Sequence, residues 1–361
     1  MTEEKIKEIL SNVKEPVLNV DYVTLDFVKN ISLNGKNLIL GLGISEVSDD
    51  IKTKAVEDIK NEFKRSLPEL ENVNVNFTTG ITEHKNSKKS SVMPGIKNTI
   101  AIASGKGGVG KSTVAVNIAV TLAMQGAKVG LIDADIYGPS IPLMFGINSR
   151  PGVTKIGDKN KLVPLEKYGV KVMSIGFLME EKQAVVWRGP MASSALKQFM
   201  GDVVWGELDF LLFDMPPGTG DIQLTLSQTI PLTAVIIVTT PQDISLADAR
   251  KGLIMFEKVN VPTLGIIENM SYYQNTDGSK EYIFGKDGGK KMSEEHKVKL
   301  LGEIPIYTKV RIGGDEGIPI VTGDANSEAA KIFTSISKQL INEVNFMNAV
   351  SKQSSNLVIE I

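Results

Sequence analysis

The sequence predicts an α/β protein in which a small α+β domain precedes a mainly parallel, doubly wound sheet with helices on both faces. From residue 98 onward, apolar runs rich in β-branched residues alternate with helical stretches, a pattern typical of a parallel sheet covered on both faces. Residues 1–80 follow a different order, helix–strand–strand–helix–strand. At 361 residues the chain has room for two domains of about 100–200 residues each.

The first 80 residues predict the small αββαβ domain. Glu3–Val13 carries apolar residues at helical spacing, and Asn34-Gly35 is a hairpin turn signal between two strand-like runs. Ser48-Asp49-Asp50 can cap the second helix. The elements after the first helix are expected at Val23–Leu33, at Asn37–Ile44, from Ser48 to about Ser66, and at Val73–Phe77.

Residues 81–97 predict a linker, because they are polar, contain Ser, Lys, Pro and Gly, and have no periodicity. The alternative is a long surface loop within one domain, although loops of that length are uncommon in compact domains. The larger domain then covers residues 98–345 and ends in a helix at about Ser327–Val344. Residues 346–361 are expected to form a polar C-terminal tail.

Composition excludes several classes of site. The net charge of −2 gives no electrostatic reason to expect nucleic acid or an acidic membrane surface as a partner. The N-terminus lacks an apolar signal core, and the apolar runs are too short to span a bilayer, so we expect a cytoplasmic protein. With no cysteine, this chain cannot form disulfides or thiolate-ligated metal sites from its own residues. His84 and His296 are too few for an imidazole metal cluster.

The larger domain contains strand-like runs that are apolar almost throughout, as expected where both faces of a sheet are covered. They are Thr99–Ser104, Lys128–Asp133, Val170–Ile175, Phe210–Asp214, Ala234–Thr239 and Thr263–Glu268.

A phosphate-binding loop follows the first of these strands. Thr99–Ser104 leads into GKGGVGKST and then into the helical stretch Val114–Gln125, which is the strand, glycine turn and helix that a Walker A motif requires. Glycines let the backbone approach the phosphates, and successive N–H groups point at the anion. The motif therefore predicts a P-loop ATPase that binds ATP and Mg²⁺. The expected nucleotide-binding residues are Gly105, Lys106, Gly107, Gly108, Val109, Gly110, Lys111, Ser112 and Thr113.

Each polar side chain of this loop has an expected role. Lys111 would bridge the β and γ phosphates as a catalytic residue, and Ser112 Oγ would be a ligand of Mg²⁺. Thr113 would reach the α phosphate. Lys106 lies before the nest of N–H groups, so its side chain would project away from its own nucleotide and could reach one bound by a second copy of the chain. The alternative is that Lys106 is a solvated loop lysine.

Acidic residues end two of the strands, at the edge where the ligand crevice of a doubly wound sheet lies. Asp133 would orient the attacking water or hold the metal's water shell, while Asp135 would order the loop that follows. A helix cap or turn is the alternative for this pair. Asp214 ends Phe210–Asp214 in Walker B form and would hold Mg²⁺, directly or through water. The following Met215–Asp221 suits a loop that senses the γ phosphate.

Asn269 ends another strand at the same crevice. Its amide offers both donors and an acceptor, which suits the edge of adenine. A capping role for this side chain is the alternative.

Five motifs together resemble the Mrp/ApbC family of deviant-Walker-A ATPases, a class that includes MinD and ParA proteins and the nitrogenase iron protein. They are GKGGVGKST (105–113), DADIYGPS (133–140), DMPPGTGD (214–221), TTPQ (239–242) and ENMSY (268–272). Trp187–Met191 is also typical of the Mrp branch. The resemblance covers residues 98–345, and residues 1–80 resemble the small domain, similar to a cytosolic iron–sulfur assembly factor, that is often fused in front.

The resemblance implies a sandwich homodimer in which Lys106 crosses to the partner's nucleotide and is catalytic. It implies that Asp133 is the catalytic switch aspartate and that Asn269 touches adenine. It also implies a role as an iron–sulfur cluster carrier, in which a 4Fe–4S cluster at the dimer interface passes to apoprotein clients and assembly proteins are further partners.

The sequence departs from the family at the cluster site. Many relatives carry Cys-x-x-Cys shortly after ENMSY, whereas those positions here are Asn275 and Gly278. Neither supplies a thiolate, and Asp277-Gly278 is typical of a solvated turn.

Two alternatives to a cluster carrier follow from that departure. One is a nucleotide-switched dimeric scaffold without its own cluster. The other is a partitioning ATPase of the MinD/ParA type, although Ser351–Ile361 contains no basic amphipathic helix for a membrane.

Overall fold

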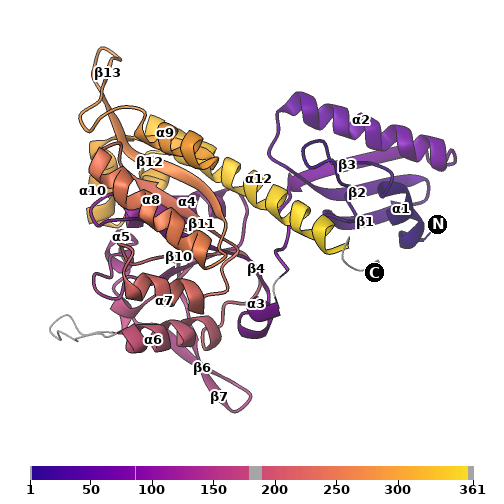
Figure 1. Cartoon of the computed structure of the whole chain (residues 1–361). Coiled ribbons are helices and arrows are strands. Elements are labelled where there is room, and N and C mark those ends of the chain that lie inside the picture. Colours follow the sequence, from indigo (N-terminus) through magenta and orange to yellow (C-terminus); the bar gives the residue numbers. More distant parts are fainter. Residues whose placement is uncertain (1, 86, 179–188, 357–361) are drawn as a thin grey trace. The chain divides into compact units, whose positions relative to one another are not determined.

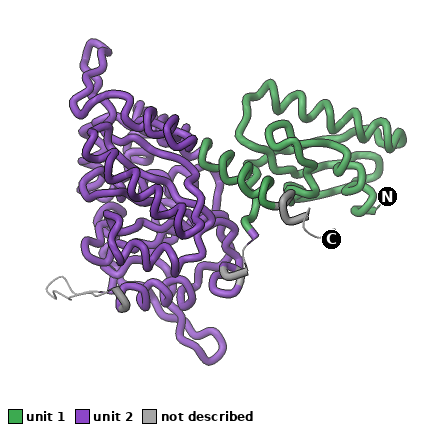
Figure 2. The backbone as a smooth tube through the Cα atoms, in the orientation of Figure 1, with its two compact units in different colours: residues 1–84, 338–361 green, residues 85–337 purple. Residues whose placement is uncertain are grey.

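The computed structural model describes residues 2–85, 87–178 and 189–356 (Figure 1). The chain divides into two compact units (Figure 2), one formed by residues 1–84 with 338–361 and the other by residues 85–337. The sequence predicts two domains in this order, and the fold class is confirmed for both.

The first unit contains the expected order of elements: α1 (Glu3–Leu10), β1 (Val28–Asn34), β2 (Asn37–Ile44), α2 (Asp49–Ser66) and β3 (Asn72–Thr79). The sheet order is β1-β2-β3, with β1 antiparallel and β3 parallel to the central strand.

Local differences from the expected elements have simple causes. The tight turn between β1 and β2 is Gly35-Lys36, and Gly35 has a φ of 64° that suits glycine. β1 begins at Val28 because hydrogen bonds fold residues 21–27 into a turn. Ser48 is at the N-cap position of α2, but its side chain makes no capping hydrogen bond there.

Every second residue of β2 contributes its side chain to the core of the first unit. Leu38, Leu40 and Leu42 are fully buried, as are Ile59 and Phe63 one helical turn apart on α2. These side chains form one cluster with the buried residues of α1.

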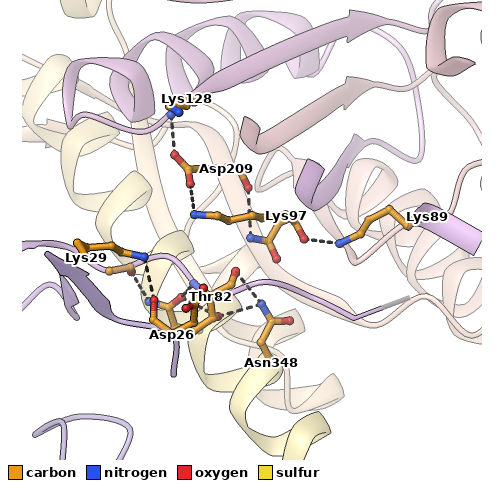
Figure 3. A network of polar contacts seen from close by, with 11 residues as sticks. Asp26, Lys29, Thr82, Lys89, Lys97, Lys128, Asp209 and Asn348 are labelled. Carbon is orange, nitrogen blue, oxygen red and sulfur yellow. Dashed lines mark hydrogen bonds and ion pairs between the residues drawn. The ribbon is translucent and has the colours of Figure 1, made fainter. Parts of the chain in front are cut away.

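The helix α12 (Glu328–Asn356) extends beyond the expected helix, and residues 338–361 belong to the first unit. Asn345 Oδ1 accepts from the Thr82 backbone N–H at 2.8 Å and from Thr82 Oγ1 at 2.9 Å, and Asn345 Nδ2 donates to the Gly80 carbonyl at 2.7 Å. Asn348 Nδ2 donates to the Thr82 hydroxyl and carbonyl (Figure 3). The tail expected at 346–361 is therefore helical as far as Asn356, because polar residues that look solvated in sequence are buried and bonded.

The expected linker also carries ordered structure. It contains α3 (Ser87–Val92), and β4 begins within it at Ile96. Two lysines of this stretch are tied to the second unit: Lys89 Nζ donates to the Lys97 carbonyl at 2.5 Å, and Lys97 Nζ pairs with Asp209 at 2.7 Å (Figure 3). Asp209 also accepts from the Lys128 backbone N–H. Composition indicates a solvated linker because it cannot show that a lysine is buried.

The second unit is built on one large sheet, in the order β13-β12-β11-β4-β10-β5-β9-β8, with β14 paired to β12. Pairing is parallel from β12 through β9 and antiparallel at the edge strands β8 and β13. The strands are β4 (Ile96–Ala103), β5 (Val129–Asp133), β8 (Leu165–Lys167), β9 (Val170–Ser174), β10 (Leu208–Asp214), β11 (Ala234–Thr239), β12 (Thr263–Gln274), β13 (Lys280–Glu281) and β14 (Leu300–Ile306). A separate hairpin joins β6 (Gly152–Ile156) to β7 (Lys159–Val163).

Helices cover the central strands, whose residues are buried almost without exception. α4 packs on β4, β5 and β10, and α8 packs on β11 and β12. In chain order the helices are α4 (Lys111–Met124), α5 (Ile141–Met144), η1 (Ile175–Phe177), α6 (Gly189–Gly201), α7 (Asp221–Thr229), α8 (Asp243–Lys258), α9 (Gly288–His296), α10 (Thr308–Glu316) and α11 (Ile320–Gly323). Among the described residues, none of the helices combines the length and apolarity needed to cross a bilayer.

Candidate functional site

Three neighbouring strands end together at one edge of the large sheet. β10 lies between β4 and β5, and the register pairs Asp214 with Ile102 on one side and with Asp133 on the other. The loop Gly105–Thr113 follows β4 directly and leads into α4. The parallel register therefore brings the phosphate loop and both strand-end carboxylates together.

The loop has the backbone that its glycines predict. Gly108 and Gly110 have φ values of 80° and 81°, the left-handed region that favours glycine. Gly105 lies so close to the backbone of α8 at Asp248 that a Cβ would collide with it. A Cβ on Gly110 would likewise collide with the side-chain amide of Asn269. These glycines are fixed by conformation and by close approach of neighbouring groups.

Lys111 is the first residue of α4, and its ammonium group is buried among acidic side chains. Its Nζ donates to Asp214 Oδ1 at 2.6 Å and to Ser112 Oγ at 3.2 Å, and it lies 3.9 Å from Asp135 Oδ2. Asp214 is completely buried. The structure thus brings together Lys111, Ser112, Asp214 and Asp135, of which the sequence predicts that the first three act on the same ligand.

Asp133 is held by donors on both of its oxygens. Oδ2 accepts from Ser174 Oγ at 2.9 Å and from the Ile141 backbone N–H at 3.3 Å, and Oδ1 accepts from the Asp135 N–H at 3.2 Å. Ser174 ends β9, beside Asp133 in the register, and is itself fixed because its Oγ accepts from the Gly176 N–H. The orientation of the Asp133 carboxylate is therefore set by its surroundings.

Burial and the neighbouring carboxylate of Asp214 raise the pKa of Asp133 and of Asp135. Burial raises the pKa of Asp133 well above its usual value, and the charge of Asp214 raises it further. The Ser174 hydrogen bond, the charge of Lys111 and the Ile141 N–H lower it in turn. Burial also raises the pKa of Asp135, against the opposing charge of Lys111. The carboxyl groups of Asp133, Asp135 and Asp214 therefore share the positive charge of Lys111, which is too little to balance all three.

A bound cation would supply the positive charge that the site lacks. Asp214 Oδ2 is buried and has no hydrogen-bond partner among the described residues, so one carboxylate oxygen is available to a metal ion or to its bound water. The hydroxyl of Ser112 lies nearby, in contact with Lys111. Within the described residues no group of three or more His, Asp or Glu side chains could hold a metal by itself. These residues fit Mg²⁺ that arrives with phosphate oxygens, as Mg²⁺ commonly does.

Asn269 contacts the phosphate loop from β12, and Lys106 is part of the loop itself. Asn269, on β12, is buried, and its Nδ2 donates to the Val109 carbonyl at 2.9 Å, so in this structure the amide supports the loop. Lys106 is half-buried, and its carbonyl accepts from Ser104 Oγ at 2.9 Å, while among the described contacts its ammonium has no hydrogen bond or ion pair. The loop backbone at Lys106 is therefore anchored while its charged group is not.

Two polar residues of this edge are not anticipated from the sequence. Ser174 could have been found, because the rule that places Asp133 at the carboxyl edge applies equally to the last residue of the next strand. Glu268, on β12, accepts from the Gly289 N–H at 2.5 Å, and burial raises its pKa. No sequence signal connects Glu268 to residue 289, because that contact depends on where α9 lies.

The segment that carries Cys-x-x-Cys in many relatives forms a turn closed on itself. The Asn275 N–H donates to the Ser279 carbonyl, and the Gly278 N–H donates to the Asn275 carbonyl. Asp277 Oδ1 accepts from both the N–H and the hydroxyl of Ser279. The exposed side chains of this turn satisfy one another and include no thiolate, so they do not fit an iron–sulfur cluster. Within Trp187–Met191, Trp187 and Arg188 lie outside the described residues.

Comparisons with known proteins cover nearly the whole chain. Residues 95–341 match the family described as NUBPL iron-transfer P-loop NTPase, and residues 3–77 match the family described as iron–sulfur cluster assembly protein. The chain is 42% identical to an iron–sulfur cluster carrier protein of Synechocystis over 348 residues, which cover 96% of this chain and 98% of that protein. It is 43% identical to the carrier protein of Escherichia coli over 340 residues, covering 93% and 89%.

Solved structures agree with the fold. A nucleotide-binding protein of Archaeoglobus fulgidus, solved in complex with ADP and with cobalt found in it, is 36% identical and has a TM-score of 0.59, covering 70% of this chain and 98% of that one. The cell division ATPase MinD of Pyrococcus furiosus is 24% identical, with a TM-score of 0.51, and covers 67% and 97%; this likeness concerns the fold alone.

The buried pair of Lys111 and Asp214 predicts strong coupling in stability. Lys111→Met leaves Asp214 buried without its cation, and we expect the free energy of unfolding to fall by about 3–5 kcal/mol. Adding Asp214→Asn removes the uncompensated charge and should recover most of that loss. Urea unfolding followed by tryptophan fluorescence measures both, because Trp205 is buried in the second unit.

Lys128→Met is the matched control, because Lys128 is an exposed lysine of the same unit. It should change stability by less than about 0.5 kcal/mol. A double variant no more stable than Lys111→Met would contradict the assigned pair.

Proposed function

Because the chain belongs to the iron–sulfur cluster carrier family of P-loop NTPases, we propose that it is a homodimeric ATPase whose nucleotide cycle serves delivery of iron–sulfur clusters to apoproteins. The observation that carries the ATPase proposal is the buried group of Lys111, Asp214 and Asp133 beside the phosphate loop. A lysine buried against a strand-end carboxylate and next to a nest of N–H groups is suited to polyphosphate.

Binding ATP would redistribute the charges of this group. The β and γ phosphates offer Lys111 more negative charge than a single carboxylate does, so the ammonium would leave Asp214 for the phosphates. Asp214 and Ser112 would then hold Mg²⁺, which when bound neutralises the charge on the phosphate oxygens. The loop N–H groups would hold the remaining phosphate oxygens. Binding of nucleotide and metal is thus cooperative. The phosphates draw the Lys111 ammonium away from Asp214, which frees this carboxylate for the metal. The metal in turn replaces the positive charge that Asp214 loses with Lys111.

Hydrolysis would depend on Asp133. Its carboxylate would orient a water molecule for attack on the γ phosphorus and accept its proton, so that the bond to the ADP oxygen breaks. Ser174 and the Ile141 N–H fix one carboxylate oxygen, which leaves few orientations open to the group. A raised pKa also makes Asp133 a stronger base than an exposed aspartate. Ser174 acts through Asp133 as a positioning residue.

The second copy of the chain would contribute Lys106. The backbone of this residue is anchored through Ser104, while its ammonium has no described partner within the same copy. A charge supplied from the partner would stabilise the phosphoryl-transfer transition state, as an arginine finger does. ATP would then favour the closed dimer, because it gains this contact only there.

Iron–sulfur clusters are cargo in this proposal, and their thiolate ligands come from outside the chain. The sequence contains no cysteine, and the Asn275–Ser279 turn is closed by its own hydrogen bonds. These observations also favour a second candidate function, a nucleotide-switched dimeric scaffold that organises assembly partners without touching the cluster. The two differ in whether iron and sulfide ever remain with this protein.

Anaerobic reconstitution with iron and sulfide separates the two functions. The protein alone should retain no more cluster iron than a cysteine-free control protein. Together with a cysteine-bearing apoprotein client, a carrier should increase the cluster that reaches the client in an ATP-dependent way. A client that fills equally well without this protein would rule out the carrier function and leave the scaffold.

Ser174→Ala should change the pH dependence of ATP hydrolysis. Asp133 must be ionised to act, so the rate rises with pH through the pKa of this group. The Ser174 hydrogen bond lowers that pKa, and its removal should therefore move the acid limb of the kcat profile to higher pH. At high pH the variant should approach the wild-type rate, whereas Asp133→Asn should stay about 10²-fold slower at every pH.

Ser337→Ala is the control, since Ser337 is a fully buried serine of α12, an element that contributes no side chain to the group around Asp133. An acid limb that stays in place in Ser174→Ala would show that Ser174 does not act on the catalytic group.

Lys106→Ala should keep ATP binding through Lys111 but lose dimer closure and turnover. Wild-type activity per chain should rise with protein concentration, and sedimentation with a non-hydrolysable ATP analogue should show a dimer. The variant should sediment as a monomer and hydrolyse ATP at least about 10²-fold more slowly. Lys128→Ala, at an exposed lysine of the same unit, should behave as wild type. Normal dimerisation and turnover in Lys106→Ala would make Lys106 a solvated loop residue.

A further inference from the structure

The strand β12 changes its backbone conformation directly after Asn269. Its pairing with β14 shifts register between Asn269 and Tyr273, and Met270 has a φ of 56°, in the left-handed region. A non-glycine residue is uncommon there, and such a conformation persists only where its surroundings hold it. Ser271 Oγ donates to the Glu268 carbonyl at 3.0 Å, which closes the backbone around Met270. The strand therefore bulges at the residue after Asn269, and bulges beside functional sites commonly set the direction of a side chain.

Beside this bulge, the Asn269 amide contacts the phosphate loop. Its Nδ2 donates to the Val109 carbonyl at 2.9 Å, and the residue is 7% exposed. The same amide lies against Gly110, where a Cβ would collide with it, and the Cε of Met270 also lies beside Gly110. Two consecutive residues of β12 therefore lie against two consecutive residues of the loop.

The bond to Val109 fixes the direction of a neighbouring donor. A peptide group is planar and trans, so the Val109 C=O and the Gly110 N–H point in opposite directions. Because the carbonyl is turned toward Asn269, the N–H points away from it. This N–H makes no backbone hydrogen bond among the described residues, so it can donate to an anion. With the carbonyl turned around, the same peptide group would present its negative end to the phosphates.

We propose that Asn269 positions the phosphate loop: by holding the Val109 carbonyl, it keeps the Gly110 N–H directed at the polyphosphate of the nucleotide. The bulge at Met270 is the backbone feature that lets the amide reach the loop. This inference deepens the proposed function and rests on it, because it concerns the loop that would hold ATP.

The positioning role differs from the adenine contact that the family resemblance implies for Asn269. An amide that contacts adenine acts through the base. A positioning amide acts through the phosphates, whatever base they carry. Ligands with and without a base therefore separate the two roles.

The first test compares such ligands. Asn269→Ala removes the donor, and the affinities for Mg²⁺–ADP and for Mg²⁺–pyrophosphate, each measured by isothermal titration calorimetry, should fall by the same factor, about three- to tenfold. The factor is the same because the loop N–H groups would bind the phosphates of both ligands.

Asn98→Ala is the matched control. Asn98 is a buried asparagine of the second unit whose Nδ2 also donates to a backbone carbonyl, that of Asp209, but at the amino end of β4. Both substitutions should lower the Tm, because each removes a buried hydrogen bond, whereas Asn98→Ala should keep the wild-type affinity for both ligands.

Three outcomes would overturn the positioning role. The first is a larger fall in affinity for ADP than for pyrophosphate in Asn269→Ala, and the second is no fall for either ligand. The third is a wild-type chain that binds ADP but not pyrophosphate, since the base then carries the affinity.

The second test addresses the bulge. Met270→Gly and Met270→Val both remove the thioether side chain, but only glycine adopts a φ of 56° without strain. Met270→Gly should keep the affinity for pyrophosphate within about twofold of wild type. Met270→Val should lose affinity as Asn269→Ala does, because a β-branched residue disfavours this conformation. Equal affinity in the two variants would contradict the role of the bulge.

The two proposals can fail separately. ATP hydrolysis by the wild-type chain is measured on the same preparation. Asn269-dependent binding of pyrophosphate without hydrolysis refutes the ATPase cycle and keeps the positioning role. Hydrolysis by a chain whose affinity for pyrophosphate does not depend on Asn269 does the reverse. A wild-type chain that binds neither ligand refutes both.

Discussion

One buried ammonium group has to balance three carboxyl groups at the carboxyl edge of the sheet, and the rest of the site depends on that imbalance. Lys111 is bonded to Asp214 and lies near Asp135, and its charge also lowers the pKa of Asp133. Burial prevents water from screening these charges. The edge therefore favours anything that brings positive charge, and a magnesium–nucleotide complex brings it together with phosphates that occupy the lysine. A single shortage of charge would account for the proposed binding of metal and nucleotide as a unit.

Those parts of the fold and site that are encoded locally can be predicted from the sequence. Continuous apolar runs predict the central strands, and the glycine spacing predicts the loop whose Gly108 and Gly110 have positive φ. Because parallel strands end at one edge, the same reasoning predicts that Asp133 and Asp214 lie together, and the register of β5 and β10 pairs them directly.

What the sequence does not predict depends on contacts between distant segments. Asn345 and Asn348 look solvated until Thr82 is placed against them, so the helical extension of α12 resembles a polar tail in sequence. The strand β14 contains glycine, glutamate and proline in LLGEIPI, which hides its apolar pattern. The bond from Asn269 to the Val109 carbonyl spans 160 positions, and sequence spacing carries no information about it.

The loop between β10 and α7 connects the charge balance to the rest of the second unit. The Met215 N–H donates to the Ile102 carbonyl and the Gly218 N–H donates to the Ser104 carbonyl, so β4 and the start of the phosphate loop hold this segment at two points. Asp214 precedes the loop, and α7 follows it directly. In the proposed cycle Lys111 moves from Asp214 to the phosphates. Any displacement of Asp214 that results must either be absorbed within this short anchored segment or move α7.

The fold of a P-loop ATPase is compatible with many tasks, and in this chain the anchored loop after Asp214 connects the nucleotide site to α7. The Asn275–Ser279 turn lies at the far end of β12 and is closed by its own hydrogen bonds, without any thiolate. Replacing cluster ligands there changes neither the charges around Lys111 nor the anchors of the loop after Asp214. The proposed nucleotide switch is therefore physically independent of cluster ligands at this turn, and it can operate in a chain without them.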